Sequence, residues 1–277
     1  MKIEINEVDR LARCDCHIHP AYSIDASGSV ERFVRAAIDK GLKKICFTTH
    51  IDLDPRRTSV DRFIRYENRL FVLDDEIVFH YIDDVKNARR KFGDEIEILY
   101  GFEFSYEPDY ENLIERFIDK FKPEFSIGSV HSIESFEITS HKSIEIISRI
   151  FEPARFIEKY YAIVLSLARS RLFDVIGHID GYKKYISRYW GLSKIENIEM
   201  EIFPQVASEI ADTGMAFEIN SSAFRKGFPA PYPSAAIIKT LLDAEVPLGS
   251  FGSDAHRPED VGSQIEHAAN YLKGAIL

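Results

Sequence analysis

The stretch CDCHIH at residues 14–19 places two histidines one residue apart, shortly after an aspartate. Side chains of a β-strand alternate between two faces, so Asp15, His17 and His19 would share one face while Cys16 and Ile18 lie on the other. Two neutral imidazoles on one face can bind a transition-metal ion. Taken alone, the stretch fits either a metal site or an ordinary polar strand end. The motifs in the rest of the chain are needed to distinguish these two interpretations.

Short β-rich runs alternate with amphipathic stretches along the chain, a pattern typical of parallel β/α units. One such stretch, 29–41, carries apolar residues at helical spacing and ends at a glycine. We predict one domain over residues 1–277, of class α/β, folded as a seven-stranded (β/α)7 TIM-like barrel. An open doubly wound sheet is the alternative, but no glycine-rich dinucleotide fingerprint supports it. The expected strands are 13–19, 43–50, 95–106, 124–133, 173–180, 215–222 and 247–256.

The composition indicates a packed globular protein with an acidic balance. Hydrophobic residues make up 45% of the 277 residues, and the net charge of −10 argues against broad nucleic-acid binding. Three cysteines form no disulfide framework and favour a reducing cytoplasm. The N-terminus lacks a signal-peptide pattern, and the longest apolar run, 160–168, is too short to span a bilayer. We therefore expect a cytoplasmic protein with no membrane contact, and the sequence makes no prediction of its oligomeric state.

Six of the nine histidines fall at the predicted ends of five strands, where the active sites of such barrels lie. The remaining three, His80, His141 and His267, are assigned no role. The joint pattern predicts metal binding, and histidines together with carboxylates suit Zn, Mn or Fe. A catalytic zinc ion typically takes three protein ligands, so the set favours two to three divalent ions. The candidate ligands are His17, His19, Asp25, His50, Glu103, His131, His178, Asp254 and His256.

The motifs D-C-H-I-H, F-T-T-H, G-F-E, S-V-H-S, G-H-I-D and G-S-D-A-H, in this order, resemble those of the PHP (polymerase and histidinol phosphatase) family. Within the family, G-H-I-D-x-x-K-K at 177–184 and E-I-N-S-S-A-F-R at 218–225 look most like the stand-alone histidinol-phosphatase branch. The resemblance implies a distorted seven-stranded barrel and a trinuclear metal centre. It implies a first ion on His17, His19, Glu103 and Asp254, a second on Glu103 as a bridge, His131 and His178, and a third on Asp25, His50 and His256.

Hydrolysis of a small phosphate monoester is the chemistry that fits such a centre, with histidinol phosphate as the substrate that the resemblance implies. A hydroxide bridging the first two ions would attack phosphorus in line. Glu103, His131 and Asp254 are the side chains that we expect in this catalytic centre.

Cationic side chains should help to hold the phosphate. We expect this role for Arg225, because a guanidinium grips phosphate through two N–H groups, and secondarily for Lys183 and Lys184. Glu134 is the expected partner of the substrate amine.

Three other interpretations remain open at this point. The chain could be a PHP phosphoesterase acting on another monoester or on nucleic-acid ends. It could be an amidohydrolase or a TatD-like deoxyribonuclease, which also use an H-x-H barrel but have no need of Asp25, His50 and His256. It could also be a metal-dependent binding protein without catalysis.

Overall fold

Seven parallel strands form one sheet in the computed structural model, which describes residues 3–57, 62–134 and 136–276. The first and last strands meet, since Ile18 pairs in parallel with Ala255 and the His19 N–H donates to the Ala255 carbonyl at 2.8 Å. The sheet is thus nearly closed, and the predicted (β/α)7 barrel is confirmed. Its order is β1 (Cys14–Ile18), β2 (Lys44–Asp52), β5 (Glu97–Ser105), β6 (Phe125–Ser129), β9 (Val175–Ile176), β10 (Ala216–Asn220) and β11 (Leu248–Gly252).

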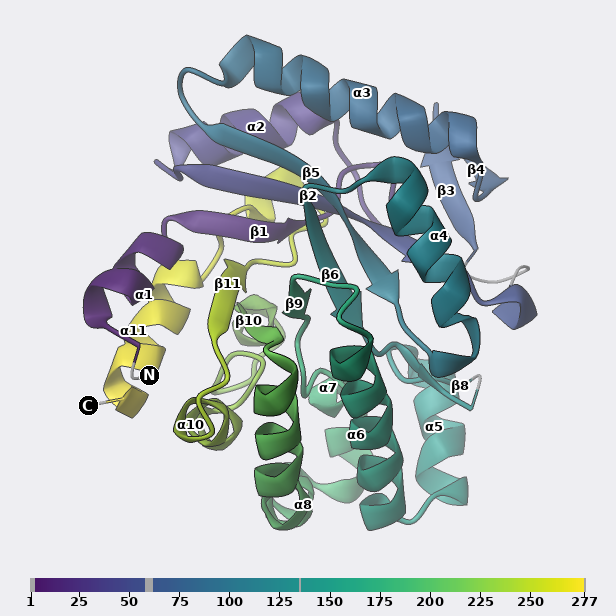
Figure 1. Cartoon of the computed structure of the whole chain (residues 1–277), viewed down its shortest axis with the longest axis vertical. Coiled ribbons are helices and arrows are strands. Elements are labelled where there is room, and N and C mark those ends of the chain that lie inside the picture. Colours follow the sequence, from purple (N-terminus) through teal and green to yellow (C-terminus); the bar gives the residue numbers. More distant parts are fainter. Residues whose placement is uncertain (1–2, 58–61, 135, 277) are drawn as a thin grey trace.

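Helices cover the outside of this sheet, with α2 and α3 along one side and α6 and α8 along the other (Figure 1). In α2, the buried Val30, Phe33, Val34 and Ala37 recur at helical spacing, which turns one face of the helix toward the strands. The described helices are α1 (Ile5–Leu11), α2 (Val30–Asp39), α3 (Asp75–Phe92), α4 (Glu111–Phe121), α5 (His141–Ile150), α6 (Pro153–Ser170), α7 (Lys183–Trp190), α8 (Leu192–Thr213), α9 (Ser222–Arg225), α10 (Ala235–Asp243) and α11 (Ile265–Ile276). None of these described helices combines the length and the apolar character needed to cross a lipid bilayer.

Three strands end four residues earlier than the sequence pattern predicts. The expected strand 124–133 ends at Ser129, 173–180 contains only the two-residue β9, and 247–256 ends at Gly252. Two of the early ends have a backbone cause, because His178 has a φ of 22° and Asp254 a φ of 55°. A positive φ leaves the extended region and stops a strand. Both residues are candidate metal ligands, so the chain turns where it presents these side chains.

Two small antiparallel ribbons, which the sequence analysis did not predict, extend the mouth of the barrel. The first pairs β3 (Phe63–Tyr66) with β4 (Arg69–Val72), and the second pairs β7 (Ser132–Ile133) with β8 (Phe136–Glu137). They follow the carboxyl ends of β2 and β6 in the chain, on the side where the candidate ligands lie. Phe63 and Glu137 therefore line the central cavity.

Candidate metal centre

The carboxyl ends of the strands bring all nine candidate ligands to one cavity of about 640 Å³. His17 and His19, from the end of β1, are completely buried beneath it. The other seven line its wall: Asp25, His50, Glu103, His131, His178, Asp254 and His256.

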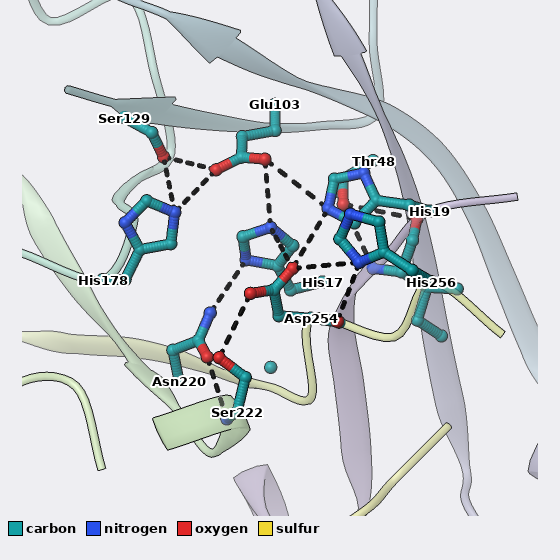
Figure 2. A network of polar contacts seen from close by, with 12 residues as sticks. His17, His19, Thr48, Glu103, Ser129, His178, Asn220, Ser222, Asp254 and His256 are labelled. Atoms are coloured by element: carbon teal, nitrogen blue, oxygen red, sulfur yellow. Dashed lines mark hydrogen bonds and ion pairs between the residues drawn. The ribbon is translucent and has the colours of Figure 1, made fainter. Parts of the chain in front are cut away.

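Glu103, at the inner end of β5, lies at the centre of this group and is completely buried (Figure 2). One carboxylate therefore faces five imidazoles. Glu103 Oε2 lies 3.3 Å from His17 Nε2, 3.5 Å from His19 Nε2 and 2.9 Å from His50 Nδ1. Glu103 Oε1 lies 3.3 Å from His131 Nε2 and 2.8 Å from His178 Nε2.

Three atoms at this centre are buried and make no well-aligned hydrogen bond to the described residues: His17 Nε2, His19 Nε2 and Glu103 Oε2, although His50 Nδ1 lies 2.9 Å from the last. An unsatisfied buried polar atom costs about 1–3 kcal/mol, so three of them together indicate a missing partner. The 3.3 Å and 3.5 Å separations between these nitrogens and this oxygen are long for N–H···O bonds. They match the edge, roughly 3.3 Å, of a tetrahedron of ligands around a zinc-sized ion. The donor set therefore fits a transition-metal ion.

A second acid, Asp254, lies just past β11 and closes the same group from the other side. Its Oδ1 is 3.6 Å from His19 Nε2 and 3.9 Å from His17 Nε2. Its Oδ2 accepts a hydrogen bond from the Ser222 hydroxyl at 3.1 Å, which fixes the carboxylate (Figure 2).

Asp25, His50 and His256 gather nearer the mouth of the cavity. His256 Nε2 lies 3.2 Å from Asp25 Oδ2 and 3.4 Å from His50 Nε2. The groups of described side chains that could hold one ion overlap, so the ligands do not separate cleanly into the three sets expected from the family resemblance. The groups are His19, His50 and His256; His17, Glu103 and His178; and His17, His19 and Asp254.

Hydrogen bonds behind the imidazoles turn two of them toward the centre. The His17 Nδ1–H donates to Glu218 Oε1 at 2.6 Å, and the His256 Nδ1–H donates to the Asp254 carbonyl at 3.0 Å. Because a carboxylate and a carbonyl can only accept, each contact fixes the tautomer that leaves Nε2 free for a metal. The sequence analysis missed Glu218. The available signal was a charged residue in the apolar run AFEIN, two residues before Asn220 and hence on the same strand face.

Asp15 shares the strand face of the two histidines but is not one of these ligands. Its carboxylate accepts hydrogen bonds from the Ser253 N–H at 2.8 Å, the Ser253 hydroxyl at 2.5 Å and the Gly262 N–H at 2.7 Å. The aspartate of D-x-H-x-H thus ties β1 to the segment that carries Asp254.

The electrostatics favour the charge state that metal binding requires at Glu103 and His19, whereas His17 and His50 are held toward the protonated form by the carboxylates beside them. Burial acts to raise the pKa of Glu103, but His17 and His131 hold it well below its ordinary value. Burial, together with His50, lowers the pKa of His19 well below its usual range, so this imidazole is neutral. Although burial opposes it, Glu103 raises the pKa of His50 to about 9, so a metal ion has a proton to displace there.

Two expected phosphate contacts, Arg225 and Lys184, lie in the cavity wall. Arg225 Nη2 donates to the Asp254 carbonyl at 3.1 Å, and its Nη1 is buried without a hydrogen-bond partner among the described residues. Lys226 and Arg257 line the cavity as well, although the sequence analysis did not name them.

Lys183 and Glu134 lie elsewhere, and both expectations are corrected. Lys183 is buried at the start of α7, where its ammonium pairs with Asp180 at 2.7 Å and with Glu199. Glu134 pairs with Lys159 at 2.5 Å and faces a separate cavity. A φ of 50° at Glu134 turns the chain there. Neither side chain lines the central cavity.

Comparison with known proteins finds relatives that align over most of the chain. The "Probable histidinol-phosphatase" of Deinococcus radiodurans is 27% identical over 261 residues, which is 94% of this chain and 92% of the relative. The "Histidinol-phosphatase" of Bacillus subtilis is 26% identical over 266 residues, or 91% of this chain and 96% of the relative. The crystal structure of a histidinol phosphate phosphatase from Lactococcus lactis, complexed with zinc, L-histidinol and phosphate, superposes with a TM-score of 0.75. It has 21% sequence identity and covers 95% of this chain and 93% of that one, so it supports the fold.

The family model of the PHP domain matches residues 15–222. This span covers most of the chain and includes the candidate ligands from His17 to His178. Together with the buried histidines around Glu103, the match establishes that this chain belongs to the PHP domain family.

Proposed function

We propose that this protein is a metal-dependent phosphatase that hydrolyses histidinol phosphate to histidinol and phosphate. The observation that carries the proposal is the buried set of His17 Nε2, His19 Nε2 and Glu103 Oε2, which make no hydrogen bond to the described residues and lie beneath a cavity with four cationic side chains in its wall. Relatives named as histidinol-phosphatases align over more than nine-tenths of this chain, which supports the choice of substrate. The proposal treats residues 1–277 as one catalytic domain.

We assign two to three divalent ions, Zn, Mn or Fe, to this centre. When bound, such ions lower the pKa of water and neutralise charge on the phosphate oxygens. Glu103 would bridge two ions, because its two oxygens face different histidines. The proposed ligand sets are His17, His19, Glu103 and Asp254; Glu103, His131 and His178; and Asp25, His50 and His256.

The remaining cavity residues bind and orient the substrate in this proposal. Arg225 offers its unpaired Nη1–H groups to phosphate oxygens, and Lys184 and Lys226 add positive charge to the same wall. Lys226 Nζ also lies 3.6 Å from Asp254 Oδ2, so this lysine holds a ligand carboxylate in place. Phe63, Val130 and Glu137 also line the cavity, and they offer apolar contact and negative charge to the organic part of the substrate.

The overall charge and the cysteines fit the expected setting. A net charge of −10 favours a small phosphorylated substrate over nucleic acid. Cys14, Cys16 and Cys46 are free thiols, as a cytoplasmic location requires.

Phosphate release tests the proposal. The purified protein, supplied with Mn, Zn or Fe, is assayed against histidinol phosphate, other phosphate monoesters and a phosphodiester, with bound metal quantified in parallel. We expect the highest kcat/KM on histidinol phosphate. A metal-loaded protein that releases no phosphate from any monoester, or that prefers the diester, would refute the proposal.

A further inference from the structure

Glu218, on β10, is a completely buried acid that the proposed chemistry has not yet used. Its Oε1 accepts the His17 Nδ1–H at 2.6 Å, and its Oε2 accepts the backbone N–H of His178 at 3.0 Å. The Asn220 amide also donates to Oε2 at 3.4 Å. One carboxylate thus spans two residues that belong to two of the proposed ligand sets.

We propose that Glu218 is a positioning residue that sets two metal sites at once, through the side chain of His17 and the backbone of His178. The inference rests on the proposed metal centre and deepens it, because it names a residue outside the ligand set on which metal affinity depends.

The contact with His17 fixes the chemistry of its imidazole. Because Glu218 Oε1 is an acceptor, His17 carries its proton on Nδ1, and Nε2 presents a lone pair. That Nε2 lies 3.3 Å from Glu103 Oε2 and 3.9 Å from Asp254 Oδ1, where an ion would sit. A carboxylate behind a metal-binding histidine both orients the ring and raises its basicity as a ligand.

The contact with His178 holds an unfavourable turn of the backbone. β9 ends at Ile176, and His178 has a φ of 22°, so its N–H has left the sheet. Glu218 Oε2 accepts this N–H, and the turn places His178 Nε2 2.8 Å from Glu103 Oε1. Without an acceptor, this N–H would be buried and unpaired, and the turn would lose a contact that maintains it.

The neighbouring strand leaves room for this arrangement only because residue 252 is glycine. A Cβ at Gly252 would lie 2.2 Å from Glu218 Oε1 and 2.4 Å from His17 Cβ. The space above Gly252 is therefore filled by the pair formed by Glu218 and His17.

Both contacts need an acceptor, which makes Glu218→Gln a sharp test. An amide has one carbonyl oxygen, so in this variant an NH2 group would face either His17 Nδ1–H or the His178 N–H. Glu218→Asp keeps both acceptors on a side chain shorter by one methylene. We expect zinc affinity, measured by competition with a chelator, to fall about 10- to 100-fold in Glu218→Gln and by less in Glu218→Asp.

Glu199→Gln is the matched control, because Glu199 is a comparably buried acid whose partners, Tyr161, Tyr182 and Lys183, lie away from the central cavity. It should bind zinc as the wild type does. Phosphatase activity of Glu218→Gln should recover as the metal concentration is raised, whereas the control should need no extra metal. This metal-dependent rescue separates positioning from a general loss of structure.

The outcomes distinguish this inference from the proposed function. A wild-type protein that binds no zinc contradicts the proposed metal centre itself. If the wild type binds zinc and the affinity of Glu218→Gln stays within about twofold of it, the positioning role is wrong. Should the glutamine variant fail to fold by circular dichroism, the aspartate variant alone decides, since it retains the charge.

Discussion

Replacing Arg225 by alanine tests how the cavity holds the phosphate. Arg225 follows β10 in the short helix α9 and lines the cavity. Its Nη2 donates to the Asp254 carbonyl at 3.1 Å, and its Nε lies 3.9 Å from Asp260 Oδ1. Its Nη1 is buried and has no hydrogen-bond partner in the described part of the chain. The guanidinium is thus anchored at one end, with donors left for a phosphate oxygen at the other.

The size of the effect follows from that free donor. A hydrogen bond from a charged donor to phosphate contributes about 1.5–3 kcal/mol. At 1.4 kcal/mol per factor of ten, Arg225→Ala should lower kcat/KM by about ten- to a hundredfold. Metal content should hold, because the Asp254 carbonyl keeps its donor His256 Nδ1 at 3.0 Å and the Asp254 carboxylate keeps the Ser222 hydroxyl at 3.1 Å.

The assay is kcat/KM on histidinol phosphate, with bound metal quantified for each variant. Arg225→Lys should recover only part of the loss, since an ammonium cannot reproduce the planar fork of donors. Arg149→Ala, at an arginine whose side chain is 74% exposed on α5, is the control and should behave as the wild type. Unchanged kinetics in Arg225→Ala would show that phosphate does not use this donor. A loss of metal in that variant would instead show that the segment after β10 is structural.

Four further outcomes are expected. Glu103→Gln should lose more than one metal equivalent by elemental analysis. The control His267→Ala, at an exposed residue of α11, should lose none. Equal losses of metal in the two variants would contradict a bridging role for Glu103. His50→Ala should lose about one equivalent and most of its kcat/KM, and full retention of both would remove the third ion from the proposal. Lys183→Met leaves the buried carboxylates of Asp180 and Glu199 without their cation, so the free energy of unfolding in urea should fall by about 3–5 kcal/mol. A fall below about 1 kcal/mol would mean that these two carboxyl groups are neutral in the folded protein. Adding zinc to the metal-free protein should raise Tm, because an ion that binds only the folded state stabilises it; an unchanged Tm would argue against a preformed site.

The position of the metal centre could be predicted because it depends on chain direction alone. In a parallel barrel, every strand delivers its carboxyl end to the same rim, so residues as distant as His17, Glu103 and Asp254 meet without any knowledge of side-chain packing. The seven strands were recognisable for a similar reason, since each is a short apolar run bounded by turn signals. Their exact ends were not, because a positive φ, such as 55° at Asp254, cannot be recognised from the type of the residue alone.

Side-chain direction on short elements could not be read from the sequence. Lys183 and Lys184 are neighbours at the start of α7, so they project about 100° apart and need not face the same surface. Only the packing of α7 against α8 decides that Lys183 is buried against Glu199 while Lys184 lines the cavity. The β7–β8 turn poses the same difficulty, since it directs Glu134 toward Lys159 and leaves Glu137 in the cavity wall.

The sign of the charge in the cavity explains how an acidic chain can bind a phosphate. Asp25, Glu103 and Asp254 place three carboxylates at the cavity, an environment that attracts divalent cations rather than phosphate. Three bound divalent ions would reverse this and leave the ligand set at about +3, because bound ions are the largest local charges in such a site. Arg225 and Lys226, in the cavity wall, would then strengthen the attraction of the bound metals for phosphate. Without the metals, these two cations cannot overcome the repulsion between phosphate and the carboxylates. Phosphate binding should therefore require the metals, even though Arg225, Lys184 and Lys226 are in place without them.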